Sequence, residues 1–359
     1  MPYQTATVWR RTGSYTATYL RQNSYAPKGN LAKMAQFNYW PRYGPENYSV
    51  ILPLEDTFDP EKSTKWMQDN WHISFTSSIA YVAAIFLGRE FMKSREALKL
   101  ETPLFLWNLG LAVFSILGFV RMTPEWAWSW FGEGNSFTYS VCTASYAQGV
   151  TGFWTEQFAM SKIAEFVDTA FIVLRKRKLI FLHWYHHVTV LIYTWHAYKD
   201  HTASGRWFIW MNYGVHGFMY SYYALAALKI RLPKAFAMLI TTLQISQMVM
   251  GVLIGVVVYG IKSAGGVCQQ SYENLAFCFT IYFTYFLLFC NFFYNVYLKK
   301  NNRYTKPVVT KKTTSTDTNE DKKEELLNEV TEGKEDINAN ITLPEESAAR
   351  PRRRVQKAD

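Results

Sequence analysis

Histidine and cysteine are scarce in this sequence, with seven histidines and four cysteines among 359 residues. A membrane di-iron centre is disfavoured because it takes its ligands from several histidine clusters, whereas only one cluster is present here. A single zinc ion is not excluded by the count, but no cysteine or second histidine pair is placed to complete its ligands. There is also no serine in a nucleophile-elbow motif and no cysteine close to a histidine. Serine and cysteine nucleophiles are therefore unsupported, and so is a metal site.

Polar residues dominate only the two ends, residues 1–71 and 299–359, and they explain a mean hydropathy near zero. A helix needs about 20 largely apolar residues to cross roughly 30 Å of hydrocarbon. Seven segments of the apolar centre are long enough: Ile73–Met92, Thr102–Val120, Gly149–Leu174, Leu179–Tyr198, Trp207–Leu228, Ala235–Gly260 and Glu273–Leu298. The sequence therefore predicts an all-α membrane protein with seven transmembrane helices in a bundle.

Basic residues gather in alternate loops, as in the run 175–178 after the third predicted span. Similar clusters follow the first, fifth and seventh spans, and the other loops carry few basic residues. Positive charge marks cytoplasmic loops, so we expect a lumenal N-terminus and a cytosolic C-terminus. Residues 1–30 lack an apolar core, and the first span is therefore expected to direct insertion itself.

The formal net charge of +10 does not indicate a nucleic-acid partner. The basic residues are clusters at predicted membrane edges, and no aromatic-basic module of the RNA-binding kind is present. We expect a lumenal polar segment at 1–71 and a transmembrane domain at 72–298. Residues 299–359 mix basic with acidic residues and contain almost no aromatics. Such a segment cannot bury enough apolar surface to fold, and a disordered cytosolic tail is predicted.

Three of the seven histidines, His183, His186 and His187, lie within one apolar helix-length run. Polar groups are unfavourable inside a membrane helix and are a functional hypothesis by default. At offsets of 0, 3 and 4 they share one helical face and can converge on one substrate or ion. We therefore expect the bundle to surround a polar, histidine-lined site.

Further polar residues repeat at helical spacing in three other predicted spans. Lys162, Glu165 and Asp168 share a face of the third span, where they are either an interhelical clamp or participants in chemistry. One face of the fifth span carries Asn212, His216, Tyr220 and Tyr223. Because an amide and two phenols lie beside the histidine, a functional role is favoured for His216. The sixth offers Thr241, Gln244 and Gln247, for which hydrogen bonds between helices are the favoured interpretation.

These groups occupy a common level, roughly 6–18 Å below the predicted cytosolic surface at 1.5 Å per helical residue. The lumenal halves of the same helices are largely apolar. A ligand with a charged cytosolic head and a long apolar tail matches this layout. Without a serine or cysteine nucleophile, histidine remains for acyl transfer, through an acyl-imidazole. A non-catalytic receptor or carrier, and a metal-dependent lipid desaturase or hydroxylase, are the alternatives.

Four motifs, in order and spacing, resemble the signature boxes of the very-long-chain fatty acid elongases. They are Lys162-Ile-Ala-Glu165-Phe-Val-Asp168-Thr169, His183-x-x-His186-His187, His216-x-x-Met219-Tyr220-x-Tyr222-Tyr223 and Thr241-x-x-Gln244-x-x-Gln247. The resemblance covers about residues 60–300. The sequence of residues 179–187 is most similar to that of the branch that extends saturated chains near palmitate length.

The resemblance implies a seven-helix protein of the endoplasmic reticulum that condenses a long-chain acyl-CoA with malonyl-CoA. The products are 3-oxoacyl-CoA, carbon dioxide and CoA, and no cofactor is expected. His186 is expected to be the nucleophile and His216 the activator of malonyl-CoA, with His183 and His187 orienting them. Substrate binding is assigned to Lys162, Glu165, Asp168, Asn212, Tyr220, Tyr223, Gln244 and Gln247.

The partners implied by the resemblance are membrane lipid and the other enzymes of the elongation cycle, and a homodimer stays open. Many relatives end in a dilysine retrieval signal, whereas this sequence ends Gln356-Lys357-Ala358-Asp359. Retention in the endoplasmic reticulum is then expected to depend on Lys299–Lys300, on the run Arg352–Arg354 or on partner proteins.

The predicted topology places Cys142 and Cys268 in lumenal loops, each as the only cysteine of its loop. The endoplasmic reticulum is oxidising enough to keep a disulfide. We therefore predict that these two cysteines are bonded to each other. Cys278 and Cys290 lie within the seventh span and are expected to stay reduced.

Overall fold

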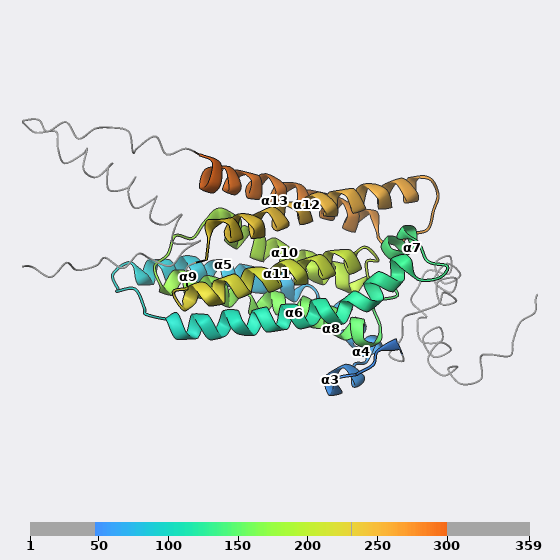
Figure 1. The fold of residues 1–359 in the computed structure, drawn as a ribbon, viewed down its shortest axis with the longest axis horizontal. Coiled ribbons are helices and arrows are strands. Elements are labelled where there is room, and N and C mark those ends of the chain that lie inside the picture. Colours follow the sequence, from blue (N-terminus) through green and yellow to red (C-terminus); the bar gives the residue numbers. More distant parts are fainter. Residues whose placement is uncertain (1–46, 231, 300–359) are drawn as a thin grey trace, which may run out of the picture. The chain divides into compact units, whose positions relative to one another are not determined.

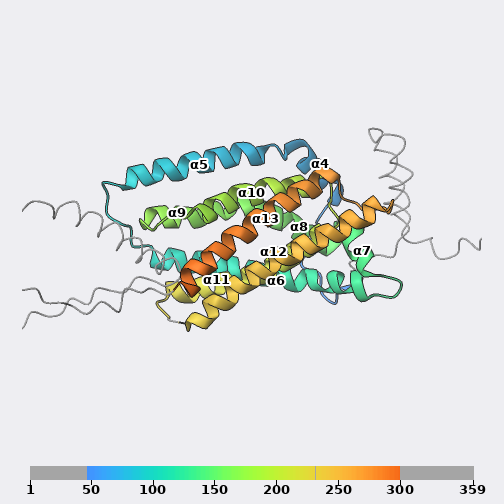
Figure 2. The same cartoon turned by 90° about the horizontal axis from the view of Figure 1, so that it is seen from above.

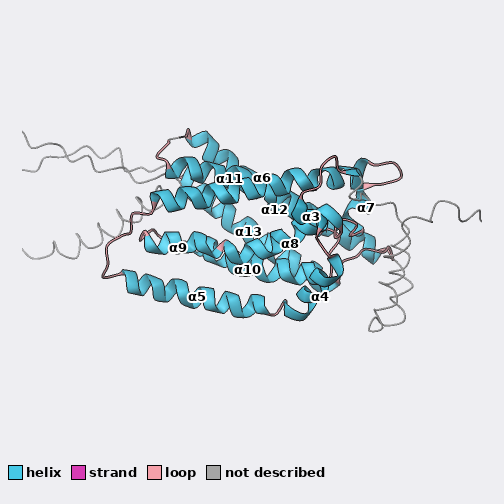
Figure 3. Ribbon diagram, turned by 90° about the horizontal axis from the view of Figure 1, so that it is seen from below, coloured by secondary structure: helices cyan, strands magenta, loops and turns pink. Residues whose placement is uncertain are grey.

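The apolar segments fold as helices that lie alongside one another in the computed structural model, which describes residues 47–230 and 232–299 (Figure 1). Residues 51–299 belong to one structural unit and residues 47–50 to another. Within the described ranges there is no β-strand, as Figure 3 shows. The predicted all-α class is therefore confirmed.

Each of the seven predicted spans is helical in the structure. In chain order they correspond to α5 (Ile73–Met92), α6 (Glu101–Phe131), the pair α8 (Gly149–Ala164) and α9 (Phe166–Leu174), α10 (Phe181–Lys199), α11 (Gly205–Ala227), α12 (Lys234–Ser263) and α13 (Tyr272–Phe293). Three shorter helices are α3 (Pro53–Asp56), α4 (Pro60–Asn70) and α7 (Phe137–Cys142), and a π-helical turn, Tyr294–Leu298, follows α13.

Among the described residues, three helices are by themselves long and apolar enough to cross a membrane: α6, α12 and α13 with its π-helical turn. The pair α4 and α5, bent by 60°, adds a fourth if it is one broken span. Helix α8 has 16 residues and is too short to qualify, whereas α10 and α11 carry the histidines discussed above. The count of seven membrane crossings stays a prediction.

Helix α6 continues well beyond the predicted end at Val120, and that boundary was wrong. The sequence Arg121-Met-Thr-Pro124-Glu125 suggested that the apolar span stops there. In the structure the charges are neutralised: Arg121 pairs with Glu55, and Glu125 pairs with Arg206. Pro124 is accommodated inside the helix, which runs on to Phe131.

The third predicted span is not one helix, because it breaks at Glu165 between α8 and α9. The predicted continuous face of charged residues is therefore interrupted. Lys162 lies in the last turn of α8, whereas Asp168 lies in the first turn of α9. The two carboxylates consequently have different partners, described below.

Residues of the predicted polar N-terminal segment pack on the helices. Glu55 of α3 is buried, with a bond from Arg121 Nε at 2.7 Å and one from Trp154 Nε1 at 2.7 Å. Helix α4 contacts α8 and α10. Residues 1–46 and 300–359 lie outside the described residues. They include the predicted disordered tail except its first residue, Lys299, and the retention candidates Lys300 and Arg352–Arg354.

The helices pack as neighbouring pairs around α10 and α11. Helix α6 makes its most extensive contact with α11, which also touches α12, and α12 packs on α13. Helix α10 contacts α5, α8 and α13, so it lies in the interior of the arrangement. Figure 2 shows α10 and α13 between α5 and α12. This packing brings the polar segments of α8, α10, α11 and α12 toward each other.

One disulfide joins the C-terminal end of α7 to the loop before α13. It links Cys142 and Cys268, the predicted pair, whose Cα atoms are 4.2 Å apart. Next to it, the Ala144 amide donates to Gln269 Oε1 at 2.6 Å and the Gln269 amide to the Cys142 carbonyl at 3.0 Å. Cys278 and Cys290 are free.

Candidate active site

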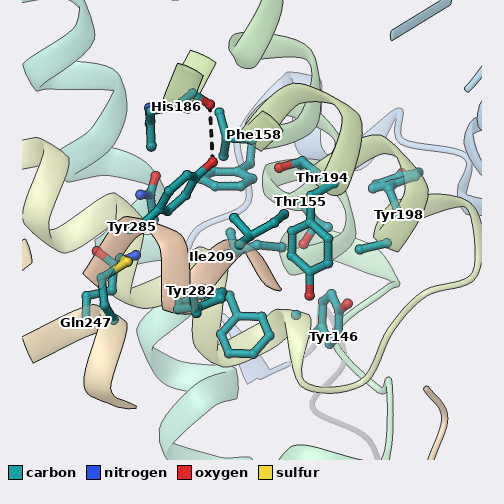
Figure 4. A pocket seen from close by; sticks show the side chains of 18 residues that line it. Tyr146, Thr155, Phe158, His186, Thr194, Tyr198, Ile209, Gln247, Tyr282 and Tyr285 are labelled. Atoms are coloured by element: carbon teal, nitrogen blue, oxygen red, sulfur yellow. Dashed lines mark hydrogen bonds between the residues drawn. The ribbon is translucent and has the colours of Figure 1, made fainter. Parts of the chain in front are cut away.

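A narrow cavity of about 70 Å³ runs between five helices, with side chains from α8, α10, α11, α12 and α13 in its wall (Figure 4). His186, Asn212 and Gln247 supply polar groups to it. Most of the remaining wall is aromatic or aliphatic, as with Phe158 and Ile209. The cavity therefore combines a few polar groups with an apolar lining, as small-molecule sites usually do.

His186 is the one member of the predicted catalytic set that lines this cavity. Its backbone carbonyl accepts a hydrogen bond from Tyr285 Oη at 3.3 Å, drawn in Figure 4. The Tyr285 ring centroid lies 5.0 Å from that of the imidazole. Among the described residues no side chain hydrogen-bonds to the His186 ring, so its nitrogens are available to a ligand in the cavity.

His183 and His187 lie beside His186 but face away from the cavity, toward α5 and α9. Their ring centroids are 4.5 Å apart, and the rings of His186 and His187 are 5.6 Å apart. Thr169 Oγ1 is 2.9 Å from His183 Nε2 and 2.7 Å from Tyr81 Oη. Of the three imidazoles, only His186 therefore lines this cavity, because the other two pack against neighbouring helices. Convergence of all three on one ligand stays a prediction.

A line of polar contacts connects α8 to α11. The buried Lys162 ammonium contacts Glu165 Oε1 at 2.6 Å and lies 4.0 Å from the centroid of the Phe158 ring. The same ammonium is 3.4 Å from Asn212 Oδ1. Asn212 Nδ2 is in turn 3.3 Å from His216 Nε2. Since Asn212 lines the cavity with His186, this line brings His216 next to the cavity.

Asp168 is held by two side chains from other helices. Trp107 Nε1 of α6 donates to one carboxylate oxygen at 2.6 Å, and Tyr220 Oη of α11 donates to the other at 2.8 Å. Lys162 therefore pairs with only one of the two predicted carboxylates, because the helix break at Glu165 separates it from Asp168. Asp168 and Tyr220 together tie α9, α6 and α11, which matches the clamp interpretation.

The remaining predicted binding residues are divided between the cavity and its surroundings. Gln247 is buried and lines the cavity. Gln244 Nε2 lies 3.5 Å from the sulfur of Met219 on α11, so it fits the interhelical role. Thr241, for which only an interhelical role was predicted, donates to the Ala237 carbonyl of its own helix and lies 3.4 Å from Tyr297 Oη in the π-helical turn. Tyr223 is 37 % exposed and lies outside the cavity wall.

Aromatic residues are the part of the site that sequence reasoning missed. Tyr285, Tyr282 and Phe158 line the cavity, and Trp107 holds Asp168. The chain has 62 aromatic residues, from 13 Trp, 24 Tyr and 25 Phe, so a single aromatic carries no distinguishing signal. Only their packing against the polar groups reveals their place.

No group of three or more His, Cys, Asp or Glu residues within 47–230 and 232–299 is arranged to hold a metal ion. The histidines of the cluster have different surroundings. His183 is within hydrogen-bond distance of Thr169, whereas His186 lines the cavity. Metal content stays a prediction that requires measurement.

Comparison with known proteins gives a consistent family assignment. Residues 66–305 match the family described as "ELO: GNS1/SUR4 family". A "Putative fatty acid elongase 3" of Caenorhabditis elegans is 64% identical over 328 residues, which are 91% of this chain and all of that protein. A "Very long chain fatty acid elongase 6" of Gallus gallus is 46% identical over 265 residues, 72% of this chain and 99% of that protein. This chain therefore belongs to the GNS1/SUR4 family of multi-span membrane proteins.

Proposed function

We propose that this protein is the condensing enzyme of fatty acid elongation. It joins a long-chain acyl-CoA to malonyl-CoA and produces 3-oxoacyl-CoA, carbon dioxide and CoA. Family membership and the two elongase-named relatives support the reaction class. The observation that carries the mechanism is the placement of His186, whose unbonded ring lines an otherwise largely apolar cavity.

In the first half-reaction a nitrogen of the neutral His186 imidazole attacks the thioester carbonyl of the acyl-CoA. The carbon–sulfur bond breaks, and the departing thiolate takes the proton of the other ring nitrogen. The acyl group remains on the imidazole as a reactive acyl intermediate. CoA leaves toward the side from which it entered, while the alkyl chain occupies the apolar part of the cavity.

In the second half-reaction malonyl-CoA loses carbon dioxide, and the electrons of the broken carbon–carbon bond form an enolate. The enolate carbon attacks the acyl carbonyl, the bond to the imidazole breaks, and the ring recovers its proton from water. We assign stabilisation of the developing negative charge to His216, Asn212 and the Lys162 ammonium, which contact one another in a line. His183 and His187 fix the position of the first helical turns of α10.

The finer assignments belong to the same proposal. They are an endoplasmic reticulum location, a lumenal N-terminus, seven membrane crossings, a preference for saturated chains near palmitate length, and association with other enzymes of the elongation cycle. The loop charges support the orientation. The resemblance of residues 179–187 to the palmitate-elongating branch supports the chain length.

The test uses the purified full-length protein in detergent with palmitoyl-CoA and malonyl-CoA as the only substrates. We expect carbon dioxide release together with 3-oxoacyl-CoA, detected by mass spectrometry. Binding of acyl-CoA without carbon dioxide release would instead support the carrier alternative.

A second experiment adds a chelator to the same reaction and measures the metal content of the purified protein. Loss of activity together with one metal ion per chain would contradict a purely imidazole-based mechanism.

A further inference from the structure

We propose that Tyr146 closes the end of the cavity remote from His186 and thereby sets the longest acyl chain that the enzyme accepts. The inference rests on the proposed function and names a specificity-determining residue for it. Tyr146 lies outside all four sequence motifs, in the loop between α7 and α8.

The cavity extends along α10 from His186 to Tyr198. Tyr198 follows His186 by twelve positions, which corresponds to about 18 Å of helix. On α11 the lining runs from Asn212, beside the reactive end, to Gly205 at the first residue of the helix. Figure 4 shows His186 and Tyr146 on opposite sides of the lining residues. An alkyl chain attached at His186 therefore extends toward Tyr146.

Tyr146 is held firmly in this position. Its hydroxyl donates to the Thr202 carbonyl at 2.7 Å, and only 2% of the residue is exposed. The Arg206 guanidinium carbon lies 5.3 Å from the ring centroid. The Tyr146 carbonyl accepts from Thr151 Oγ1 at 2.7 Å, at the start of α8. With both its backbone and its hydroxyl bonded, the ring is a fixed wall of the cavity.

The loop that carries Tyr146 is itself anchored. Cys142, the last residue of α7 before the loop, is bonded to Cys268 before α13. Two residues later the Ala144 amide donates to Gln269 Oε1. Helix α13 also contributes Tyr282 to the cavity wall. The disulfide therefore anchors the loop that carries Tyr146 to the segment just before α13, a helix that forms part of the cavity wall.

Gly205 lies directly against the Tyr146 hydroxyl at the closed end of the cavity. A Cβ atom added at Gly205 would lie 2.6 Å from the Tyr146 hydroxyl oxygen and 3.5 Å from the ring carbon that carries it. The first separation is a clash, whereas the second is an ordinary van der Waals contact. Only the hydroxyl therefore requires glycine at this position, and removing it makes room for one extra methyl group.

The experiment compares the purified full-length wild type with Tyr146→Ala, using saturated acyl-CoAs of increasing length and malonyl-CoA. Truncation opens the closed end. We compare kcat/KM for the acyl-CoA that is two carbons longer than palmitoyl-CoA with kcat/KM for palmitoyl-CoA itself. The ratio of the first to the second should rise about tenfold in the variant, since an apolar pocket discriminates between chains that differ by a methylene to about this degree. Tyr139→Ala is the matched control, because Tyr139 is also buried beside Arg206 but does not line the cavity. Its ratio should equal that of the wild type.

A second pair of variants tests the closure without removing the ring. Tyr146→Phe carrying Gly205→Ala places a methyl group at the closed end, and it should prefer shorter acyl chains than Tyr146→Phe alone, again by about tenfold. If this pair and folded Tyr146→Ala keep the wild-type length profile, or if Tyr139→Ala changes it equally, the inference is overturned. A wild type that releases no carbon dioxide would instead refute the proposed function itself.

Discussion

Arg206 and Glu125 form a bidentate ion pair with both side chains fully buried. Arg206 Nε is 2.7 Å from Glu125 Oε2, and Nη2 is 2.8 Å from Oε1. The pair joins α11 to the extended end of α6. Removing one partner leaves the other as an unpaired buried charge, so Glu125→Gln should lower the free energy of unfolding by about 3–5 kcal/mol. Thermal unfolding of the detergent-solubilised protein measures the loss.

The matched control for this prediction is the exposed pair Lys65 and Asp69 on α4, whose side chains are 71% and 53% exposed. Exposed ion pairs contribute little to stability because water and salt screen them. Asp69→Asn should therefore unfold at the wild-type temperature. An unchanged unfolding temperature for Glu125→Gln would show that the buried pair does not stabilise the bundle.

Asn212 is expected to position His216 for the second half-reaction. Asn212→Ala removes the amide that contacts both Lys162 and His216, and misplacing a reactive group costs about 100-fold in kcat. The rate of carbon dioxide release from malonyl-CoA measures the effect. Asn108→Ala is the control, because the buried Asn108 side chain donates to the Leu104 carbonyl of its own helix and has no other hydrogen-bond partner within 47–230 and 232–299. Equal losses in the two variants would refute the positioning role.

Stability should depend on pH through Glu55. Burial raises the pKa of its carboxyl, but bonds from Arg121, the Leu52 amide and Trp154 outweigh burial and hold the pKa below the ordinary 4.5. The folded state thus favours the charged form. This stabilisation is complete above pH 4.5 and is lost as the pH falls through the folded-state pKa. Unfolding temperatures measured at decreasing pH should fall less steeply for Glu55→Gln, and parallel curves would contradict the assignment.

The Cys142–Cys268 disulfide is expected to stabilise the protein and to survive purification without reductant. Cys142→Ser should cost about 2–5 kcal/mol of stability, in the range measured when native disulfides are removed. Cys290→Ser, which changes a free cysteine, should have little effect. Peptide mapping under non-reducing conditions should find the linked pair. Alkylation of both Cys142 and Cys268 under those conditions would show that the bond does not form.

Local patterns were enough to predict the seven apolar helical segments. Apolar runs of membrane length fixed where α5 and α10 lie, and α5 has the predicted bounds. The spacing of His183, His186 and His187 placed them on neighbouring turns. These features depend on residues close together in sequence, and periodicity describes them well.

Features that depend on distant partners could not be predicted in this way. The continuation of α6 through Arg121 requires Glu55, which lies 66 residues earlier. The partners of Asp168 come from α6 and α11, and neither Trp107 nor Tyr220 differs locally from other aromatic residues. Which histidine lines the cavity depends on how α10 is rotated against α5 and α13. Helical spacing alone does not determine that rotation.

The central claim is that His186 carries the acyl group, and trapping the intermediate tests it most directly. The purified protein is mixed with palmitoyl-CoA without malonyl-CoA, quenched in acid, digested and analysed by mass spectrometry. The account predicts the acyl mass on His186, its disappearance when malonyl-CoA is added, and neither adduct nor condensation in His186→Ala. An acyl group on His183, His187 or His216, or condensation by a folded His186→Ala protein, would contradict it.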